Sequence, residues 1–452
     1  MRFLFSAWPY SGHVHPCLSV AQALRKRGHE AAFYTGAAAR PVVESAGFPC
    51  FPFRALARRT AELVSSADTS DHPALYASLT ERYTSVAEKS PRRRWQRVRG
   101  LYEEMLAGTI DAQAEDLNAL ISEWHPDVLV TDAFLWAPVT ILQETRRIPV
   151  VVLSFFAGCM IPGPGAPPHG LGLPRPRTWW TRCVARVATF IMRRLTAPVR
   201  RATNEVRRKY GLPETTATYF ELVGRTRLHL VASSPEYDYE RSDLPESVHY
   251  AGACSYDPAA GAEPSWTSKL KAGVPVIYVS EGTCQVRQPV VLRAAAAGLA
   301  GLPVQVVMTT GRQRDPDSLD LGPVSSNTIV EPWVSLGALL PRCSVVVTNG
   351  GSGTVRAALE AGVPLVVIPM EWDQLENAQR VVECGAGLRL APSRCTAATL
   401  RAAVERVLNS PAFASNARRI AGSFARYGQG EEAARLLDTV LADSDHREIG
   451  ND

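Results

Sequence analysis

Two residues with acid–base chemistry each follow a short apolar run in the sequence. His13 comes after residues 2–7, in FLFSAWPYSGHVHP, and Asp132 follows residues 127–130, in VLVTDAF. The carboxyl ends of parallel strands meet at one edge of a sheet, so the two side chains can lie together there. A neutral imidazole accepts a proton near pH 7, and a carboxylate behind it fixes its tautomer. The pair is therefore predicted to act as a general base with its partner.

A second histidine competes for the role of base. His15 lies two residues further on, directly before Pro16. A helix is expected from about Pro16 to Arg27, because proline is tolerated in the first helical turn. His15 is then interpreted as a structural capping side chain just before that helix.

The segment 344–381 carries the strongest pattern for binding an anion. A run of valines ends at Thr348, glycines follow at positions 350, 351 and 353, and a helix is expected from Thr354. Glycines let backbone N–H groups approach an anion, and a helix N-terminus supplies further donors and a positive dipole end. This arrangement suits a diphosphate, although a tight turn without a ligand would have the same glycines.

A second polar loop follows the next apolar run. After Pro369 the chain presents Asp373 beside Gln374, with Glu371, Trp372 and Asn377 close by. A carboxylate next to an amide can form paired hydrogen bonds with vicinal sugar hydroxyls. Together the two loops indicate a phosphorylated sugar. A dinucleotide-dependent oxidoreductase is excluded on pattern, since the third glycine of G-x-G-x-x-G would fall on Arg356.

Two series of alternating strands and helices are expected to position these residues. Strands are predicted at 2–7, 31–35, 127–130 and 148–153, and then at 276–280, 304–309, 328–331, 345–348 and 365–368. Apolar runs of this kind suit parallel sheets covered by helices on both faces. The predicted fold class is α/β, with two Rossmann-like doubly wound domains facing a central cleft.

The length of 452 residues also favours two domains. The predicted division is an N-terminal domain (1–233), a linker (234–265) and a C-terminal domain (266–425). A C-terminal helix (426–441) that packs back on the N-terminal domain and a disordered tail (442–452) complete it. Segments 54–122 and 161–213 interrupt the alternation and are typical of substrate walls. The stretch 175–209 is basic and contains tryptophan. We expect it to cover the acceptor pocket or to form a solvated face, and contact with a membrane surface is the less favoured alternative.

Composition narrows the possible partners. The chain has 46% hydrophobic and 21% charged residues and a formal net charge of +5, which falls short of the concentrated basic surface of a nucleic-acid binder. Nine scattered cysteines, with no metal-ligand spacing, favour free thiols in a reducing compartment. No apolar stretch is long enough to span a bilayer. We therefore expect a cytoplasmic protein, monomer or homodimer, with no metal.

The motifs together resemble the family 1 glycosyltransferases, in particular the bacterial enzymes that modify macrolides, other polyketides and aromatic aglycones. The donor signature reads NGGSGTVRAALEAGVP (349–364) followed by DQLENA (373–378). In family order stand GHVHP (12–16), VTDAFLWA (130–137), DLPESVHYAG (243–252), VIYVSEGT (276–283) and PWVSLGALLPRC (332–343). The resemblance covers most of the chain.

This resemblance implies the GT-B architecture, an inverting reaction and no metal requirement. It makes 1–233 the acceptor-binding domain and 266–425 the nucleotide-sugar-binding domain. His13 and Asp132 fall on the family's catalytic dyad. The positions implied for donor binding are Gly12, Gly282, Thr283, Trp333 near the nucleobase, Asn349, Gly351, Ser352, Gly353 and Thr354 at the diphosphate, and Asp373 and Gln374 at the sugar. The apolar acceptor walls are assigned to Tyr10, Phe134, Trp136, Phe155 and Phe156. The expected partners are a nucleotide sugar and a small hydrophobic aglycone.

Two positions depart from the family pattern. Asn349 replaces the family histidine that contacts a phosphate, and Ala357 replaces the family glutamate that accepts hydrogen bonds from the ribose. An amide still donates a hydrogen bond but carries no charge. Because family members that use dTDP-deoxysugars often lack this glutamate as well, a dTDP-linked donor is slightly favoured over a UDP-linked one.

Two other functions fit the same fold. A sugar-nucleotide epimerase would convert the donor without an acceptor, and a catalytically degenerate relative would bind the nucleotide without turnover. The His13–Asp132 and Asp373–Gln374 pairs favour the transferase over both.

Overall fold

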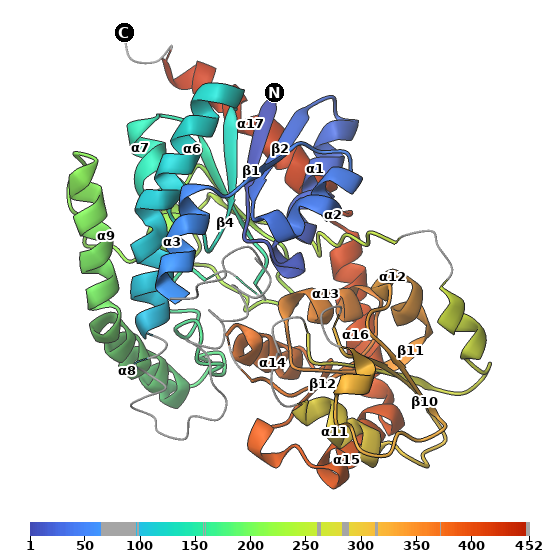
Figure 1. Cartoon of the computed structure of the whole chain (residues 1–452). Helices are drawn as coiled ribbons and strands as arrows, with labels where there is room; N and C mark the ends of the chain where they lie inside the picture. Colours follow the sequence, from blue (N-terminus) through green and yellow to red (C-terminus); the bar gives the residue numbers. More distant parts are fainter. Residues whose placement is uncertain are drawn as a thin grey trace.

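Two parallel β-sheets organise the molecule in its computed structural model (Figure 1). The structure describes residues 1–64, 96, 99–156, 158, 160–259, 264–282, 289–311, 315–370 and 372–448. The predicted fold class is confirmed: both sheets are entirely parallel and each is covered by helices.

The N-terminal sheet has seven strands in the order β3-β2-β1-β4-β5-β6-β7. Its strands are β1 (Arg2–Ser6), β2 (Glu30–Thr35), β3 (Cys50–Pro52), β4 (Val128–Asp132), β5 (Val150–Ser154), β6 (Leu228–Val231) and β7 (Val248–Tyr250). Strands β4, β5 and β6 are buried along their whole length, as strands with helices on both faces must be. The helices of this half are α1 (Ser11–Lys26), α2 (Arg40–Ser45), α3 (Ala55–Val64), α6 (Ile110–Trp124), α7 (Gln143–Thr145), α8 (Trp179–Leu195), α9 (Ala197–Lys209) and α10 (Tyr219–Leu222).

The C-terminal sheet has six strands in the order β10-β9-β8-β11-β12-β13. They are β8 (Val276–Ser280), β9 (Gln305–Thr309), β10 (Thr328–Glu331), β11 (Cys343–Thr348), β12 (Leu365–Val367) and β13 (Gly387–Arg389). Alternate residues of β8 and β11 enter two different core clusters, one on each face of the sheet. The helices are α11 (Val290–Gly298), α12 (Leu336–Leu339), α13 (Ser352–Glu360), α14 (Gln374–Glu383), α15 (Ala397–Asn409), α16 (Pro411–Ala425) and α17 (Glu431–Glu448).

Strand order reverses direction at one place in each sheet. In the N-terminal sheet the reversal lies between β1 and β4, and in the C-terminal sheet between β8 and β11. At such a point the loops after the two neighbouring strands leave toward opposite faces, and the crevice between them takes ligands in open α/β sheets. The topology therefore marks one candidate ligand crevice in each half.

The last helix returns from the C-terminal half to the N-terminal half, where it lies beside α1 (Figure 1). Ala433 and Leu437 of α17 are buried in the N-terminal core. At the surface, Asp438 accepts a hydrogen bond from Nε2 of His29 at 2.6 Å and pairs with Arg27. The chain thereby joins the two halves a second time.

Three elements differ from the sequence expectation. Helix α1 begins at Ser11, five residues before the expected start near Pro16. Strand β7 lies within the stretch 234–265 that was expected to be linker, and it is hard to detect because an edge strand is only partly buried. Helix α17 continues to Glu448, so residues 442–448 are helical where a disordered tail was predicted.

Candidate active site

His13 and Asp132 meet at the reversal point of the N-terminal sheet. Asp132 is the last residue of β4, and His13 lies in the first turn of α1, directly after β1. Nδ1 of His13 and Oδ2 of Asp132 are 3.0 Å apart, and the Asp132 side chain is fully buried. The structure therefore brings the predicted pair into hydrogen-bond contact.

Backbone groups complete the surroundings of the Asp132 carboxylate. Its Oδ2 also accepts the N–H of Trp8 at 2.7 Å, and its Oδ1 accepts the N–H groups of Phe134 at 2.7 Å and Leu135 at 3.1 Å. An ionised carboxylate only accepts hydrogen bonds, so it requires the proton of His13 to sit on Nδ1. The Nε2 lone pair is then left to accept a proton from a substrate.

Aromatic rings surround the His13 imidazole. The ring centroid of Phe155 lies 4.3 Å away, that of Phe134 5.6 Å and that of Tyr10 5.7 Å. The His13 side chain is 15% exposed. The three rings restrict the imidazole to one orientation beside an apolar wall.

The structure corrects the interpretation of His15. No side chain among the described residues caps the N-terminus of α1, and His15 lies inside the helix with its ring edge-on to Tyr256 at 5.4 Å. Pro16 is the sixth residue of the helix. A proline at this position removes the hydrogen bond to the carbonyl of Gly12, and the helix nevertheless continues through it.

The glycine loop after β11 ends in a helix N-terminus without a side-chain cap. Gly351 is the N-cap of α13, and neither a capping side chain nor an acidic residue occupies its first turn. Gly350 has φ +93°, and a Cβ there would lie 2.7 Å from Cγ1 of Val367. A Cβ on Gly353 would lie 3.9 Å from Cα of Gly12. Open N–H donors of α13, with Ser352 and Thr354 in the first turn, thus lie next to the start of α1, as an anion site requires.

Asn349 ties together the two loops at the reversal point of the C-terminal sheet. Its Nδ2 donates to the carbonyl oxygen of Glu281, and its Oδ1 accepts the N–H of Gly351 at 3.3 Å. Gly282, with φ +73°, packs against this amide. A contact between Asn349 and a donor phosphate stays a prediction. Thr283 lies outside the described residues.

Asp373 and Gln374 stand at the start of α14. Oδ2 of Asp373 accepts from Nδ2 of Asn377 at 2.8 Å, and the same Nδ2 donates to the carbonyl of Gly350 at 2.7 Å. Oε1 of Gln374 accepts the N–H of Met370 at 2.8 Å. Burial raises the pKa of Asp373, and the Asn377 hydrogen bond and the nearby His13 oppose this rise. Asp373, from the C-terminal half, thus lies near enough to His13 of the N-terminal half to be affected by its charge.

Two further predicted donor positions have distinct surroundings. Trp333 follows β10 and keeps 37% of its surface exposed, as a platform for a planar base would need. Ala357, which replaces the family glutamate, packs against the C-terminal core.

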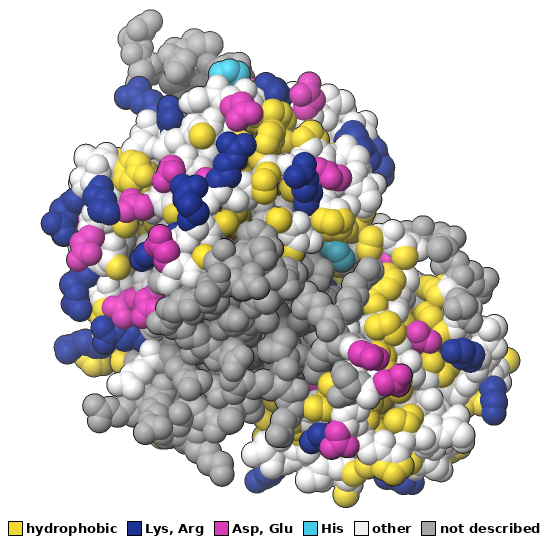
Figure 2. Space-filling view, viewed as in Figure 1, with side chains coloured by type: hydrophobic (Ala, Val, Ile, Leu, Met, Phe, Trp, Pro, Cys, Tyr) yellow, Lys and Arg dark blue, Asp and Glu magenta, His cyan; other side chains and the backbone are white. Residues whose placement is uncertain are grey.

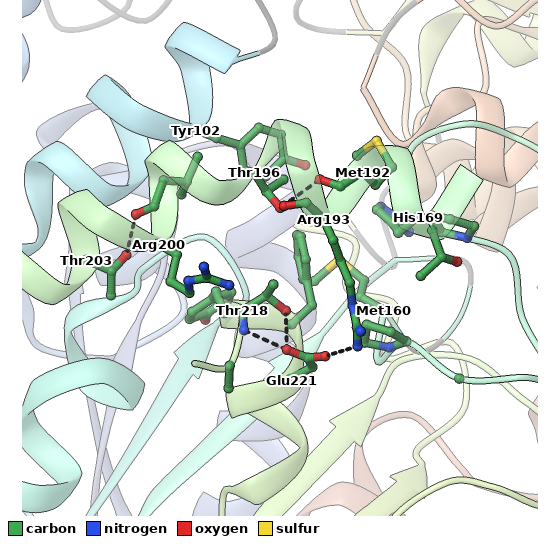
Figure 3. Close-up of a pocket in the computed structure, with 18 of the residues that line it drawn as sticks. Tyr102, Met160, His169, Met192, Arg193, Thr196, Arg200, Thr203, Thr218 and Glu221 are labelled. Atoms are coloured by element: carbon green, nitrogen blue, oxygen red, sulfur yellow. Dashed lines mark hydrogen bonds and ion pairs between the residues drawn. The ribbon is translucent and has the colours of Figure 1, made fainter. Parts of the chain in front are cut away.

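A cavity opens in the N-terminal half beside α8 and α9 (Figure 3). It is lined by Tyr102, Trp136, Met160, Pro162, Gly163, Ala166, Pro168, His169, Thr189, Met192, Arg193, Thr196, Val199, Arg200, Thr203, Ala217, Thr218, Tyr219, Phe220 and Glu221. In Figure 3 Glu221 accepts hydrogen bonds from Thr218 and Arg193 on one side of this space. The lining comes mainly from the segment 160–221, whose loops and helices show no motif in the sequence.

Only Trp136 of the five predicted acceptor residues lines this cavity. Its ring stacks on Tyr219 with centroids 4.2 Å apart and an angle of 9°. Phe155 and Phe156 lie between the cavity and the His13–Asp132 pair, because Phe156 contacts His169 at 5.2 Å while Phe155 contacts both Phe156 and His13. The aromatic residues form a continuous wall from the cavity to the imidazole.

The loop that walls the cavity is fastened to α14. Oε1 of Glu376 accepts the N–H groups of Gly170 at 3.1 Å and Gly172 at 2.7 Å. Arg380, one turn further along, bridges Glu376 at 2.8 Å and Asp238 at 2.9 Å, and all three charged side chains are at most 4% exposed. No motif in the sequence indicates this network, which ties the cavity wall to the helix that begins with Gln374, directly after Asp373.

Within the described part of the chain, no three His, Cys, Asp or Glu side chains are grouped as a metal site. No helix in the same ranges combines the length and the apolar character that a bilayer crossing needs.

Two facing Rossmann-like sheets, with a His–Asp pair in one crevice and a glycine loop before an open helix N-terminus in the other, define a GT-B glycosyltransferase. Residues 294–439 match the family model "Erythromycin biosynthesis protein CIII-like, C-terminal domain". The chain is 32% identical over 449 residues to 4'-demethylrebeccamycin synthase of Lentzea aerocolonigenes, covering 97% of this chain and 99% of the relative. It belongs to the family 1 GT-B glycosyltransferases, as its motifs predicted.

Solved structures share the same fold. The calicheamicin glycosyltransferase CalG4 superposes with a TM-score of 0.71 at 22% identity, covering 98% of both chains. The spinosyn rhamnosyltransferase SpnG complexed with spinosyn aglycone gives 0.68 at 20% identity, covering 97% of this chain and 100% of SpnG. The glycosyltransferase VinC in complex with DTDP gives 0.66 at 21% identity, covering 98% and 100%.

Proposed function

We propose that the chain transfers a sugar, with inversion and without a metal, from a nucleotide diphosphate to a hydrophobic natural-product acceptor. The observation that carries this proposal is the 3.0 Å contact between His13 and Asp132 beside the open N-terminus of α13. A proton acceptor and an anion site lie next to each other across the two halves, as a displacement at the anomeric carbon requires.

The reaction is a single displacement in this proposal. The acceptor hydroxyl oxygen forms a bond to the anomeric carbon while its proton passes to Nε2 of His13. The bond from the anomeric carbon to the β-phosphate oxygen breaks on the opposite face, and the nucleoside diphosphate leaves with the bonding electrons. Asp132 stabilises the imidazolium that forms, and the N–H groups of α13 stabilise the charge on the leaving diphosphate.

Donor recognition is assigned to the C-terminal half. Trp333 would stack on the nucleobase, the first turn of α13 would hold the diphosphate, and Asp373 with Gln374 would bind sugar hydroxyls. Ala357 offers no acceptor for a ribose 2′-hydroxyl, which favours dTDP-linked over UDP-linked donors. The dTDP complex of VinC, a protein of the same fold, agrees with this preference.

Acceptor recognition is assigned to the cavity and to the aromatic wall that leads to His13. The rings of Tyr102 and Phe220 line the cavity together with the Trp136–Tyr219 stack, of which Trp136 is only 2% and Tyr219 only 5% exposed. Planar or polycyclic acceptors suit such a surface, because aromatic rings pack in offset-stacked arrangements. The name of the rebeccamycin relative and the aglycone complex of SpnG point to natural products as acceptors.

Two single histidine variants, one at His13 and one at His15, test the catalytic role proposed for His13. His13→Ala should lower turnover about 10²–10⁴-fold, while dTDP still raises the melting temperature, since ligand binding to the folded state stabilises it in proportion to occupancy. His15→Ala is the matched control, because His15 lies in the same helix and contacts Tyr256 rather than Asp132. Full activity in His13→Ala would remove its assigned role. Equal thermal shifts with UDP and dTDP would refute the donor preference inferred from Ala357.

A further inference from the structure

Helix α8 exposes a large apolar face at the outer edge of the N-terminal half (Figure 1). Trp179 is 73% exposed, Trp180 62% and Phe190 59%, and Val184, Val187 and Ile191 are exposed as well. Residues 180, 184, 187 and 191 recur at helical spacing and therefore form one stripe. We call this surface the α8 face; it consists of these six side chains.

Basic residues predominate around the α8 face, although six of those between residues 175 and 209 pair with acidic side chains elsewhere in the chain. Helix α8 contains four arginines and no acidic residue, and residues 175–209 hold eleven Arg or Lys and a single acidic residue, Glu205. Arg193 pairs with Glu221. Within the described residues, no ion pair involves Arg182, Arg186 or Arg194. At the left edge of Figure 2, near the place of α8 and α9 in Figure 1, basic side chains and a small hydrophobic area are visible, with acidic side chains next to them.

The opposite side of α8 belongs to the acceptor cavity. Thr189 and Met192 line that cavity, and Ala185 is buried against the body of the protein. One helix therefore separates the cavity from the exposed apolar face. Whatever binds the α8 face lies within the thickness of a single helix, roughly 10 Å, of the cavity.

Charge complementarity decides between the possible occupants of the α8 face. A two-fold dimer through this face would oppose it to itself and bring its arginines against those of the other copy. An anionic lipid surface instead presents negative headgroups to the arginines and an apolar interior to Val187, Phe190 and Ile191. Tryptophan favours the membrane–water boundary, and arginine keeps its charge in the headgroup layer while its stem lies along apolar groups.

We propose that the α8 face docks the protein on anionic phospholipid membranes. The helix would lie in the plane of the interface, with its apolar stripe among the acyl chains. The cavity then lies next to the bilayer, and a lipophilic acceptor dissolved there can reach it without crossing bulk water. This last consequence rests on the proposed function; the docking itself does not.

Vesicle co-sedimentation tests the docking with the full-length protein. We expect binding to phosphatidylcholine vesicles that contain phosphatidylglycerol, little binding to phosphatidylcholine alone, and weaker binding at high salt. Trp180→Ser/Val187→Ser/Ile191→Ser should lose the binding. Arg186→Gln/Arg194→Gln should weaken it about 30-fold, since each basic residue near an anionic surface contributes about fivefold, or about 1 kcal/mol.

Matched variants separate this surface from a general effect of exposed apolar groups. Val324→Ser/Val382→Ser removes two exposed valines from the C-terminal half and should leave vesicle binding unchanged. His13→Ala should also bind vesicles normally, so a failed docking proposal and a failed catalytic proposal give different results. No binding to anionic vesicles, or equal binding by the triple serine variant, would overturn the proposal. A concentration-dependent dimer in light scattering that the triple variant abolishes would assign the α8 face to a second copy instead.

Discussion

Replacing Asp132 by asparagine is the sharpest test of the catalytic pair, because the structure predicts which way the new amide turns. The carboxylate accepts four hydrogen bonds, two on each oxygen. An NH2 group at the Oδ1 position would leave the N–H groups of Phe134 and Leu135 without an acceptor. At the Oδ2 position it would leave only the Trp8 N–H, since it can donate to Nδ1 of His13.

The second orientation is favoured because it leaves one buried N–H group fewer without an acceptor. Each such group costs about 1–3 kcal/mol. This orientation forces the His13 proton onto Nε2. Nε2 can then accept a substrate proton only in the small fraction of molecules that keep the other orientation. At about 1.4 kcal/mol per factor of ten, this change of tautomer alone lowers kcat about 5- to 150-fold. The loss cannot exceed that of His13→Ala, for which the absence of a general base predicts a loss of about 10²–10⁴-fold. The free energy of unfolding should fall by about 1–3 kcal/mol.

A double-mutant cycle provides the assay, with kcat measured at saturating donor and acceptor. If Asp132 acts only through His13, then Asp132→Asn lowers kcat in the wild type and leaves it unchanged in the His13→Ala background. The cost in unfolding free energy should be similar in both backgrounds. Equal fold-losses of kcat in the two backgrounds would refute the reasoning, because they would show that Asp132 acts independently of the imidazole.

Two further predictions concern buried charges. Arg380→Met leaves the buried Asp238 and Glu376 carboxylates without their partner and should cost about 3–5 kcal/mol in denaturant unfolding. The control Arg401→Met breaks a half-exposed pair and should cost about 0.5 kcal/mol or less. Equal losses of unfolding free energy in the two variants would contradict a tight network around Arg380. His229 lies fully buried in β6, and desolvation lowers its pKa to about 4. The unfolded chain binds this proton near pH 6.5, so the contribution of neutral His229 to the free energy of unfolding should be fully present above about pH 6.5. The free energy of unfolding should then fall by about 3 kcal/mol as the pH falls toward 4. His229→Leu should flatten that decline in urea titrations at several pH values, and an unchanged pH slope would remove His229 as its cause.

The positions of His13, Asp132 and the glycine loop at the sheet edges could be predicted from the sequence because the signals for them are local. Short apolar runs specify the strands, and the residues directly after each run must lie at the carboxyl edge of the sheet. His13, Asp132 and the glycines at 350, 351 and 353 all follow such a run. The start of α1 could not be placed in this way, since Pro9, Gly12 and Pro16 are all read as helix-breaking residues. In the structure α1 begins at Ser11 and tolerates the last two of these within it.

The acceptor side could not be predicted to the same extent. Phe134, Phe155 and Phe156, which were expected to contact the acceptor, stand between the cavity and His13, and their contact with an acceptor stays a prediction. The cavity lining comes from segments 160–221 and from Tyr102, which are far apart in sequence and follow no common spacing. Their arrangement depends on how α8, α9 and α10 pack on the sheet.

By itself, the sequence determined the two-sheet architecture, the family and the residues at the two reversal points, because strand periodicity and glycine turns act between near neighbours in the chain. Tertiary structure alone decided the partners of Asn349, Arg356 and Arg380. Asn349 binds the carbonyl of Glu281, Arg356 binds the carbonyl of Ala253, and Arg380 binds Asp238. Each contact joins residues between 68 and 142 positions apart, and a buried polar group is satisfied only by whatever the packed chain places beside it.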